Sequence, residues 1–405
     1  MNGTDMPYVY QKQDYTPPPV GYEPFYINYL GRHGSRNPIS DEYMKYVETV
    51  LKDADSKFLL TNKGKELIGQ IEMITERCKG KWGILSSKGE EEIRGIARRM
   101  TENYPQVFGE HIYAQSDNIE RCIKSMNVFL EEIKMKAGDD NITKESYPEH
   151  NAVLNFFDVN LAYIKYKKEG VWKKDYEAYA DSILGHSRFL YQLFMPAYAD
   201  SMNNKIDFLR SFFQIYTVLP NTELDVNLEN FLSGEEIYNL WDVENVRRYL
   251  EMGPSPIGDG LQTNIAFPLL EDFIVTSYNA IVEGGVSADL RFAHAETLVP
   301  FAALLGIPEA SARLTDLAEV SKNWKDFQIT PMAGNLQWIF YSNPDGNILV
   351  KMLLNEKEVK FPFDSDWAPY YEWESVMNYY QDILEKITVI PSYSIEQKIK
   401  YYKAD

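Results

Sequence analysis

The stretch FYINYLGRHGSRNP, residues 25–38, decides the expected fold of this chain. Its first six residues are mostly aromatic or aliphatic, which is typical of a buried β-strand, and Gly31 then ends the apolar run. The loop that follows places His33 between Arg32 and Arg36. Because ligands of α/β proteins bind at the carboxyl ends of strands, this loop is a candidate ligand site.

Two guanidinium groups that converge on one point repel each other unless an anion lies between them. Phosphate is the anion expected here, because the planar fork of an arginine matches phosphate oxygens. A neutral histidine nitrogen beside a bound phosphate can attack phosphorus and form a covalent intermediate. Taken alone, residues 31–38 could also form a surface loop with dispersed charges.

The order of the other expected elements favours an α/β fold. Apolar residues at helical spacing follow the loop over 41–53 and 61–78, and again behind a capping box at Ser87 and Glu90. Short strands are expected at 111–114 and 290–293, helices from about 116, over 269–280 and over 297–305, and a β-hairpin over 337–354. Strand, loop and helix units in this order indicate an α/β layer.

The chain changes character between about 135 and 255, where it is rich in Tyr, Phe, Lys and Asn and has few strand signals. We interpret this segment as a mostly helical insertion. The predicted organisation is therefore an extended N-terminal arm over 1–24, an α/β core over 25–130 and 260–405, and a helical insertion over 131–259. The consecutive prolines at 17–19 exclude a helix from the arm.

A second motif, RFAHAET at 291–297, lies at another predicted strand-to-helix junction. His294 could donate to a phosphate oxygen, and Glu296 could protonate a leaving alkoxide. A general acid of this kind contributes roughly 10²–10⁴-fold to the rate. Zinc deaminases also contain His-x-Glu, but they need a Pro-Cys-x-x-Cys motif that this chain lacks.

Arg121 is a third candidate anion ligand, because it lies in the first turn of a predicted helix and off its apolar stripe. Helix N-termini favour anions, which adds to the charge of the arginine itself. A solvated surface arginine is the alternative interpretation.

The composition narrows the classes of function. The chain has 405 residues with 60 acidic and 41 basic side chains, for a net charge of −19, so it is a poor candidate for binding nucleic acid. The two cysteines, Cys78 and Cys122, exclude a disulfide framework, although they could form one bridge or remain buried thiols. There is no phosphate-binding Gly-x4-Gly-Lys-Ser/Thr motif, and no cluster of metal ligands stands out. We therefore expect neither a metal nor a cofactor.

The sequence contains no apolar run of the roughly 18 residues that a membrane span needs, so no membrane span is expected. The N-terminus lacks the basic and apolar regions of a signal peptide. Either the protein is cytosolic or this chain begins after a removed signal.

Together, and in this order, the three motifs resemble the histidine acid phosphatase branch of the histidine phosphatase superfamily. RHGSRNP at 32–38 is the most specific match. The late HAE at 294–296 is similar to the multiple inositol polyphosphate phosphatase subgroup, since many other relatives carry His-Asp there. Further similarity lies at 83–89, 121–125, 154–158, 297–307 and 353–356.

The resemblance implies a role for each motif residue: His33 as nucleophile, Glu296 as proton donor, and Arg32, Arg36, Arg121 and His294 as the phosphate pocket. It implies an α/β domain with a helical domain inserted between about 130 and 260, and a cleft between the two. The implied substrates are phosphate monoesters, with phytate and lower inositol phosphates foremost, and no metal is required. Family members are typically exported, so an extracytoplasmic location is expected. Many relatives have several disulfides, whereas this chain can have one at most.

Phytate is a polyanion, and a protein of charge −19 must attract it through a local positive field. Lys165, Lys167 and Lys168 lie in the predicted insertion and are candidate contacts for the other phosphates of such a substrate. A solvated lysine face is the alternative interpretation.

Two further classes of function stay open. A broad-specificity acid phosphatase or sugar-phosphate phosphatase of the same superfamily would use identical chemistry in a different pocket. A non-catalytic ligand-binding protein on this fold is disfavoured, because both His33 and Glu296 are present.

Overall fold

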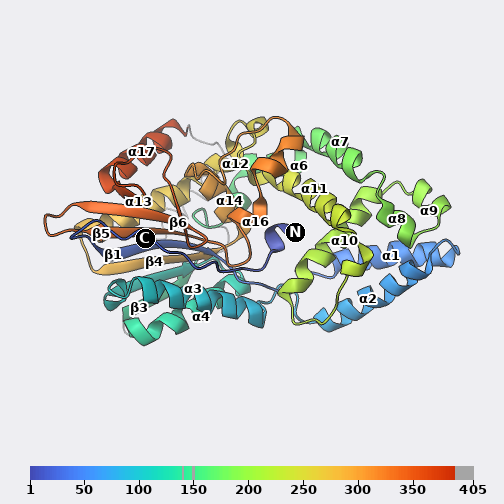
Figure 1. Ribbon diagram of the computed structural model, residues 1–405, viewed down its shortest axis with the longest axis horizontal. Helices are drawn as coiled ribbons and strands as arrows, with labels where there is room; N and C mark the ends of the chain where they lie inside the picture. The colour runs from blue at the N-terminus through green and yellow to red at the C-terminus, as the bar shows by residue number, and fades with distance from the viewer. Residues whose placement is uncertain (139–140, 148–150, 388–405) are drawn as a thin grey trace.

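A mixed β-sheet with helices on both faces forms the centre of the protein, in a computed structural model that describes residues 1–138, 141–147 and 151–387 (Figure 1). The strand order is β3-β2-β4-β1-β5-β6-β7, and β8 also pairs with β6. The strands are β1 (Glu23–Arg32), β2 (His111–Ser116), β3 (Ile142–Ser146), β4 (Val286–Ala293), β5 (Asn335–Ser342), β6 (Ile348–Leu354), β7 (Lys357–Val359) and β8 (Tyr370–Glu372).

Strands β3, β2, β4 and β1 run parallel to one another, whereas β5 is antiparallel to β1 and β6 is antiparallel to β5. The predicted strands at 25–30, 111–114 and 290–293 and the predicted hairpin are thereby confirmed. In the parallel half, all four carboxyl ends lie at one edge of the sheet. Residues that directly follow these strands are consequently neighbours, however far apart they are in sequence.

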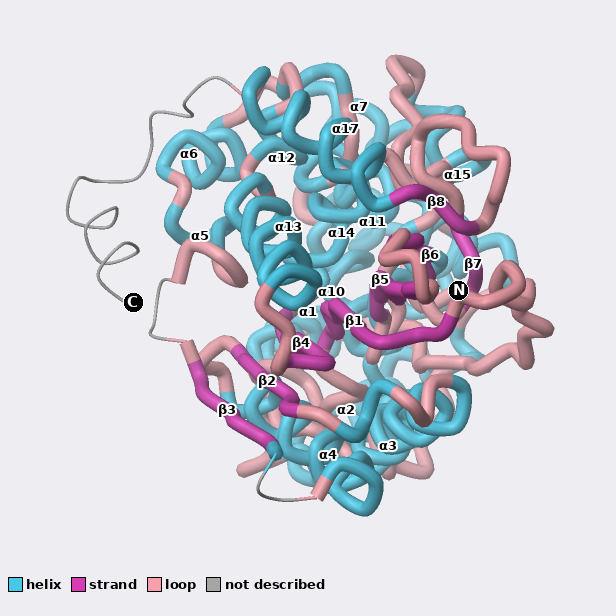
Figure 2. The backbone as a smooth tube through the Cα atoms, turned by 90° about the vertical axis from the view of Figure 1, so that its left-hand side faces the viewer, coloured by secondary structure: helices cyan, strands magenta, loops and turns pink. Residues whose placement is uncertain are grey.

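The side chains of β1 alternate between two hydrophobic clusters, as the period of a strand requires. Ile27 and Tyr29 pack with residues of α3 (Ser87–Asn103) and α4 (Glu120–Ala137), and Tyr26 and Leu30 belong to the cluster on the opposite face. The helices on that second face are α13 (Phe267–Val282), α14 (Ala295–Leu304) and α17 (Trp373–Lys386). Figure 2 shows the sheet edge-on between these two helical layers.

A second, helical part of the protein extends from one end of the sheet (Figure 1). Its helices are α1 (Glu42–Ser56), α2 (Asn62–Cys78), α5 (Phe156–Val159), α6 (Leu161–Glu169), α7 (Trp172–Leu184), α8 (Arg188–Leu193), α9 (Pro196–Ser201), α10 (Lys205–Val218), α11 (Gly234–Met252) and α12 (Leu261–Asn264). Two short helices, α15 (Val320–Asn323) and α16 (Asp326–Ile329), pack against α11.

The predicted boundaries of the insertion, 131–259, are wrong in two respects. Helix α4 continues to Ala137 and β3 then joins the sheet, so the helical segment begins only after Ser146. In addition, α1 and α2 pack on α10 and α8, although we assigned both to the α/β core. Amphipathic spacing predicts a helix and its buried face, but it does not specify which layer that face packs against. Residues 139–140, 148–150 and 388–405 of the predicted domains lie outside the described residues.

The N-terminal arm is only partly as predicted. Residues 6–20 have no regular secondary structure, but Gly3–Asp5 form a short 3-10 helix, η1, whose residues are buried. Helix η1 contacts α10, α11 and α16, and Arg32 and Arg36 of the sheet's edge bond to Thr4 and Asp5, so this segment lies between the two parts of the protein. Residues 3–5 are therefore buried although few residues of the arm are apolar. Hydrogen bonds from backbone and polar side chains hold this segment in place.

Two predicted helix starts need correction. Ser86, not Ser87, caps α3 by accepting a hydrogen bond from the backbone N–H of Gly89. Helix α4 begins at Glu120, about three residues later than expected, since the Asp117 carboxylate bonds the backbone N–H of Ile119 outside the helix. Arg121 nevertheless lies in the first turn, as predicted.

Among the described residues, one helical stretch, Leu261–Val282, is long and apolar enough to cross a membrane by length and composition. Leu269, Leu270 and Phe273 of this stretch are buried in the cluster beside β1, as in a core helix of a folded domain. Cys78 and Cys122 are both buried free thiols, so the alternative of a single bridge is not realised.

Candidate active site

The three sequence motifs meet at the carboxyl edge of the parallel strands. Arg32 at the end of β1 pairs with Ala293 at the end of β4. His33 and His294 are therefore the first residues after two neighbouring strands. Their rings lie 5.5 Å apart between centroids. Strand β2 ends beside β4, which brings Asp117 and then Arg121 to the same place.

A cavity of about 140 Å³ opens at this edge. The six predicted residues with assigned roles all line it: Arg32, His33, Arg36, Arg121, His294 and Glu296. Its other wall comes from the helical part, through Tyr43 and Met44 of α1, Ile215 of α10 and Arg248 of α11. A larger groove of about 780 Å³ runs along the N-terminal arm, but none of the predicted site residues lines it.

Backbone packing and the half-buried side chain of Glu92 hold the 33–38 loop. Glu92 of α3 accepts hydrogen bonds from the backbone N–H and the hydroxyl of Ser35, both at 2.8 Å. Gly34 packs against the backbone of Gly89 so closely that a Cβ atom on either glycine would overlap the other segment's backbone. The loop is therefore fixed to the N-terminus of α3 before any ligand binds.

Two buried arginines, Arg32 and Arg36, and the half-buried Arg121 line the cavity. Arg32 donates through Nη1 to the carbonyls of Thr4 and Thr330, and Arg36 donates through Nη2 to Asp5 at 3.4 Å. Within the described part of the chain, the buried Nε atoms of Arg32, Arg36 and Arg121 have no hydrogen-bond partner. Burial lowers the pKa of Arg32 to about 10, which still leaves it charged at neutral pH. Buried charged donors without partners are costly unless a ligand satisfies them, and an oxyanion does so.

The geometry selects one tautomer of His33. Its Nδ1 lies 2.9 Å from the carbonyl oxygen of Gly34, which can only accept, so Nδ1 carries the proton and Nε2 keeps its lone pair. Burial, reinforced by the guanidinium groups of Arg121 and Arg32, holds the pKa of His33 well below its usual 6.5. Burial and the neighbouring charges therefore favour the neutral, nucleophilic form of the imidazole.

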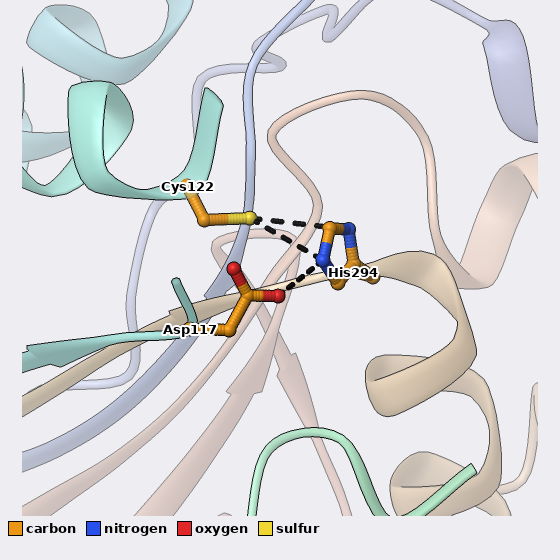
Figure 3. A group of neighbouring side chains, drawn as sticks. All are labelled: Asp117, Cys122 and His294. Atoms are coloured by element: carbon orange, nitrogen blue, oxygen red, sulfur yellow. Dashed lines mark hydrogen bonds and ion pairs between the residues drawn. The ribbon is translucent and has the colours of Figure 1, made fainter. Parts of the chain in front are cut away.

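Asp117, which the sequence did not single out, orients His294 (Figure 3). Its fully buried carboxylate accepts a hydrogen bond from His294 Nε2, and His294 Nδ1 lies 3.3 Å from Nη2 of Arg121. The thiol of Cys122 lies 3.7 Å from His294 Nε2. Figure 3 shows the three side chains converging from β2, α4 and the start of α14.

Asp117, Cys122 and His294 could in principle bind a metal ion, because their donor atoms all lie within 4.8 Å of one another. The donor set fits poorly, however. Burial, with the neighbouring Asp117 carboxylate, raises the pKa of the Cys122 thiol well above 9.0, whereas a metal binds the thiolate. The guanidinium of Arg121 beside His294 would also repel a cation.

Glu296 lies in the first turn of α14 and forms an ion pair with Arg248, 3.8 Å from Nη1 to Oε1. Burial acts to raise the pKa of Glu296, but Arg248, His294 and Lys167 outweigh it and hold that pKa at about 2. A bound phosphate dianion would offset these positive charges and raise the same pKa, which is what a proton donor needs.

Sequence reasoning missed Arg248, Asp117 and Asp5, the last of which also lines the cavity. Arg248 lies in helix α11 and Asp5 in the arm, and neither position carries a recognisable motif. The predicted lysines are on α6 and do not line the cavity; Lys167 forms an ion pair with Glu251 at 3.2 Å. Lys165 and Lys168 are exposed.

A family model confirms the resemblance. The model of the histidine phosphatase superfamily (branch 2) matches residues 26–131 and 126–355, which is most of the chain. The chain belongs to the histidine phosphatase superfamily. Human multiple inositol polyphosphate phosphatase 1 is 32% identical over 104 residues, a match that covers 24% of this chain and 21% of the human protein. The match thus spans only about a fifth of that relative.

Solved structures share the fold of this histidine phosphatase. The multiple inositol polyphosphate phosphatase of Bifidobacterium longum in complex with phosphate has a TM-score of 0.82 at 20% identity, covering 98% of this chain and 99% of that one. Its complex with inositol hexasulfate has a TM-score of 0.79, again at 20% identity and with 98% of each chain covered. The phytase of D. castellii has a TM-score of 0.69 at 14% identity, covering 98% of this chain and 86% of that one.

Proposed function

We propose that this protein hydrolyses phosphate monoesters of inositol, phytate and lower inositol phosphates, through a phosphohistidine intermediate. The observation that carries the proposal is the cavity that Arg32, Arg36 and Arg121 line together with His33, whose Nε2 keeps its lone pair. Such a cluster of arginines fits one phosphoryl group, because preorganised donors stabilise the negative charge of that group throughout the transfer. The matches to enzymes of inositol polyphosphates support the substrate class.

In the first step, Nε2 of His33 attacks phosphorus and the P–O bond to the leaving group breaks. Glu296 gives its proton to the leaving oxygen, and the arginines compensate the negative charge on the phosphoryl oxygens. In the second step, water attacks the phosphohistidine, Glu296 takes a proton from that water, and His33 is released with inorganic phosphate. Both His33 and Glu296 line the same cavity, which the two steps require.

Release of inorganic phosphate from phytate at acid and neutral pH tests this proposal. Wild type should release phosphate, and His33→Ala should release none above background. His186→Ala is the matched control, because His186 is exposed on the helical part. Full activity in His33→Ala would refute the covalent mechanism.

The alternative is a broad acid phosphatase or a sugar-phosphate phosphatase with the same chemistry. The apolar lining by Ile39 and Ile215 favours it, because neither side chain can bind an additional phosphate. Values of kcat/KM for a panel of phosphomonoesters separate the two functions. An inositol polyphosphatase should prefer inositol phosphates to p-nitrophenyl phosphate and sugar phosphates.

Lys165, Lys167 and Lys168 remain proposed contacts for distant phosphates of the substrate. Support comes from the electrostatic influence of Lys167 on Glu296, which reaches into the cavity. Replacing all three by Glu should raise KM for phytate but not for a monophosphate. An unchanged KM for phytate would remove these lysines from the site.

The protein is further proposed to act outside the cytoplasm. Support comes only from the family, whose members are typically exported. Fractionation of native cells, with activity assayed in each fraction, tests this location; activity confined to the cytosol would refute it.

A further inference from the structure

The start of the chain contributes a carboxylate to the cavity, and its position bears on which phosphate esters fit. We propose that Asp5 accepts a free hydroxyl of the substrate beside the phosphate that is cleaved, so that partly dephosphorylated rings are preferred over phytate. This inference rests on the proposed function and narrows its substrate class to esters with a hydroxyl next to the reacting phosphate.

Asp5 is held rigidly from both parts of the protein. Its Oδ1 lies 3.4 Å from Nη2 of Arg36, and its Oδ2 accepts a hydrogen bond from Thr217 of α10 at 3.1 Å. Asn221, just after α10, donates to the backbone carbonyl of Asp5 at 2.8 Å. With its side chain only 11% exposed, the carboxylate cannot swing into solvent without breaking these bonds.

The carboxylate still has accepting capacity. An ionised aspartate offers about four lone-pair sites, and the contacts with Arg36 and Thr217 occupy one on each oxygen. Because Asp5 and Arg36 both line the cavity, a substrate whose phosphate meets Arg36 brings its neighbouring ring position towards Asp5. A hydroxyl there can donate to the carboxylate, whereas a phosphate there meets a like charge.

The charges that line the cavity match a single phosphate. Four arginines face it, but Asp5 is paired with Arg36 and Glu296 with Arg248, which leaves two uncompensated guanidinium groups. A phosphate monoester dianion balances these two charges. Among the described residues, no lysine lines the cavity itself, so no further cation there is left for a second phosphate.

The test compares phytate with an inositol monophosphate in full-length wild type, Asp5→Asn and Asp14→Asn. Asparagine keeps the size of the side chain but removes its charge, and Asp14 is an exposed aspartate of the same arm. The readout is the ratio of kcat/KM for phytate to kcat/KM for the monophosphate. This ratio does not depend on the fraction of folded enzyme, so partial unfolding of a variant does not affect it.

Wild type and Asp14→Asn should favour the monophosphate, and Asp5→Asn should raise the ratio in favour of phytate about tenfold, which corresponds to about 1.4 kcal/mol. Added salt should raise the ratio in wild type more than in Asp5→Asn, because salt screens the repulsion that the substitution removes. A merely structural role of Asp5 would change both rates together and leave the ratio constant.

A ratio that Asp5→Asn leaves unchanged, or a wild type that prefers phytate, overturns this inference while the phosphatase function stands. If wild type hydrolyses neither ester, the proposed function fails first.

Discussion

Replacing Arg248 by Gln should move the pH dependence of catalysis in a defined direction. Arg248 forms the ion pair with Glu296 and is the foremost cation that lowers its pKa, from the ordinary 4.5 to about 2. Without this guanidinium the carboxylate is less favoured, so the pKa of Glu296 rises. Glu296 then stays protonated to higher pH. In the pH–activity profile, the limb on which activity falls with increasing pH moves to higher pH.

The size of this effect follows from the separation of 3.8 Å. Two unit charges about 4 Å apart interact with about 4 kcal/mol at an effective dielectric constant of about 20. The side chains of Arg248 and Glu296 are 20% and 31% exposed, and solvent screening reduces this energy to about 1–2 kcal/mol. At about 1.4 kcal/mol per pKa unit, we expect the limb to move by about one pH unit.

The assay measures kcat from acid to neutral pH with saturating inositol monophosphate, whose alkoxide leaving group requires a proton. Values of kcat report the enzyme–substrate complex, so changes in substrate affinity do not enter. Arg313→Gln, at an exposed position, removes the same charge and should leave the limb in place. If the limbs of Arg248→Gln and wild type coincide, the coupling between Arg248 and Glu296 is absent and the reasoning fails.

Three further substitutions test the remaining parts of the site. Glu296→Gln should lower kcat roughly 10²–10⁴-fold and abolish the falling limb, and a pH profile identical to that of wild type would exclude Glu296 as the proton donor. Asp117→Asn should lower kcat about 10–100-fold, since it removes the carboxylate that accepts from His294 Nε2 and orients the ring; an unchanged kcat in correctly folded protein would remove this positioning role. Gly89→Ala should lower both activity and the melting temperature, because its Cβ overlaps the backbone of the nucleophile loop. Gly69→Ala in α2, where a Cβ meets nothing within 4 Å, is its control and should be neutral or stabilising by about 0.5–1 kcal/mol; equal effects of both would contradict the packing argument.

Short stretches of sequence were sufficient to predict the strands and the residues directly after them. Residues 25–38 predicted a buried strand with His33 and two arginines at its end, and 291–297 predicted the second strand-to-helix junction. Both predictions succeeded because a strand and the loop it carries are local, and because parallel strands bring their carboxyl ends to one edge. Neither prediction required knowledge of how the helices pack.

Tertiary structure alone decided the rest of the cavity. Asp5 and Arg36 are 31 residues apart in sequence, and Asp5 reaches the site because Thr217 and Asn221 hold it there. The packing of α11 against η1 and α14 brings Arg248 to Glu296. Tertiary structure also decides the layer to which α1 and α2 belong, because that depends on which apolar helix faces fit together. Contacts between residues far apart in the chain depend on the shape of the whole core, and no local spacing encodes that shape.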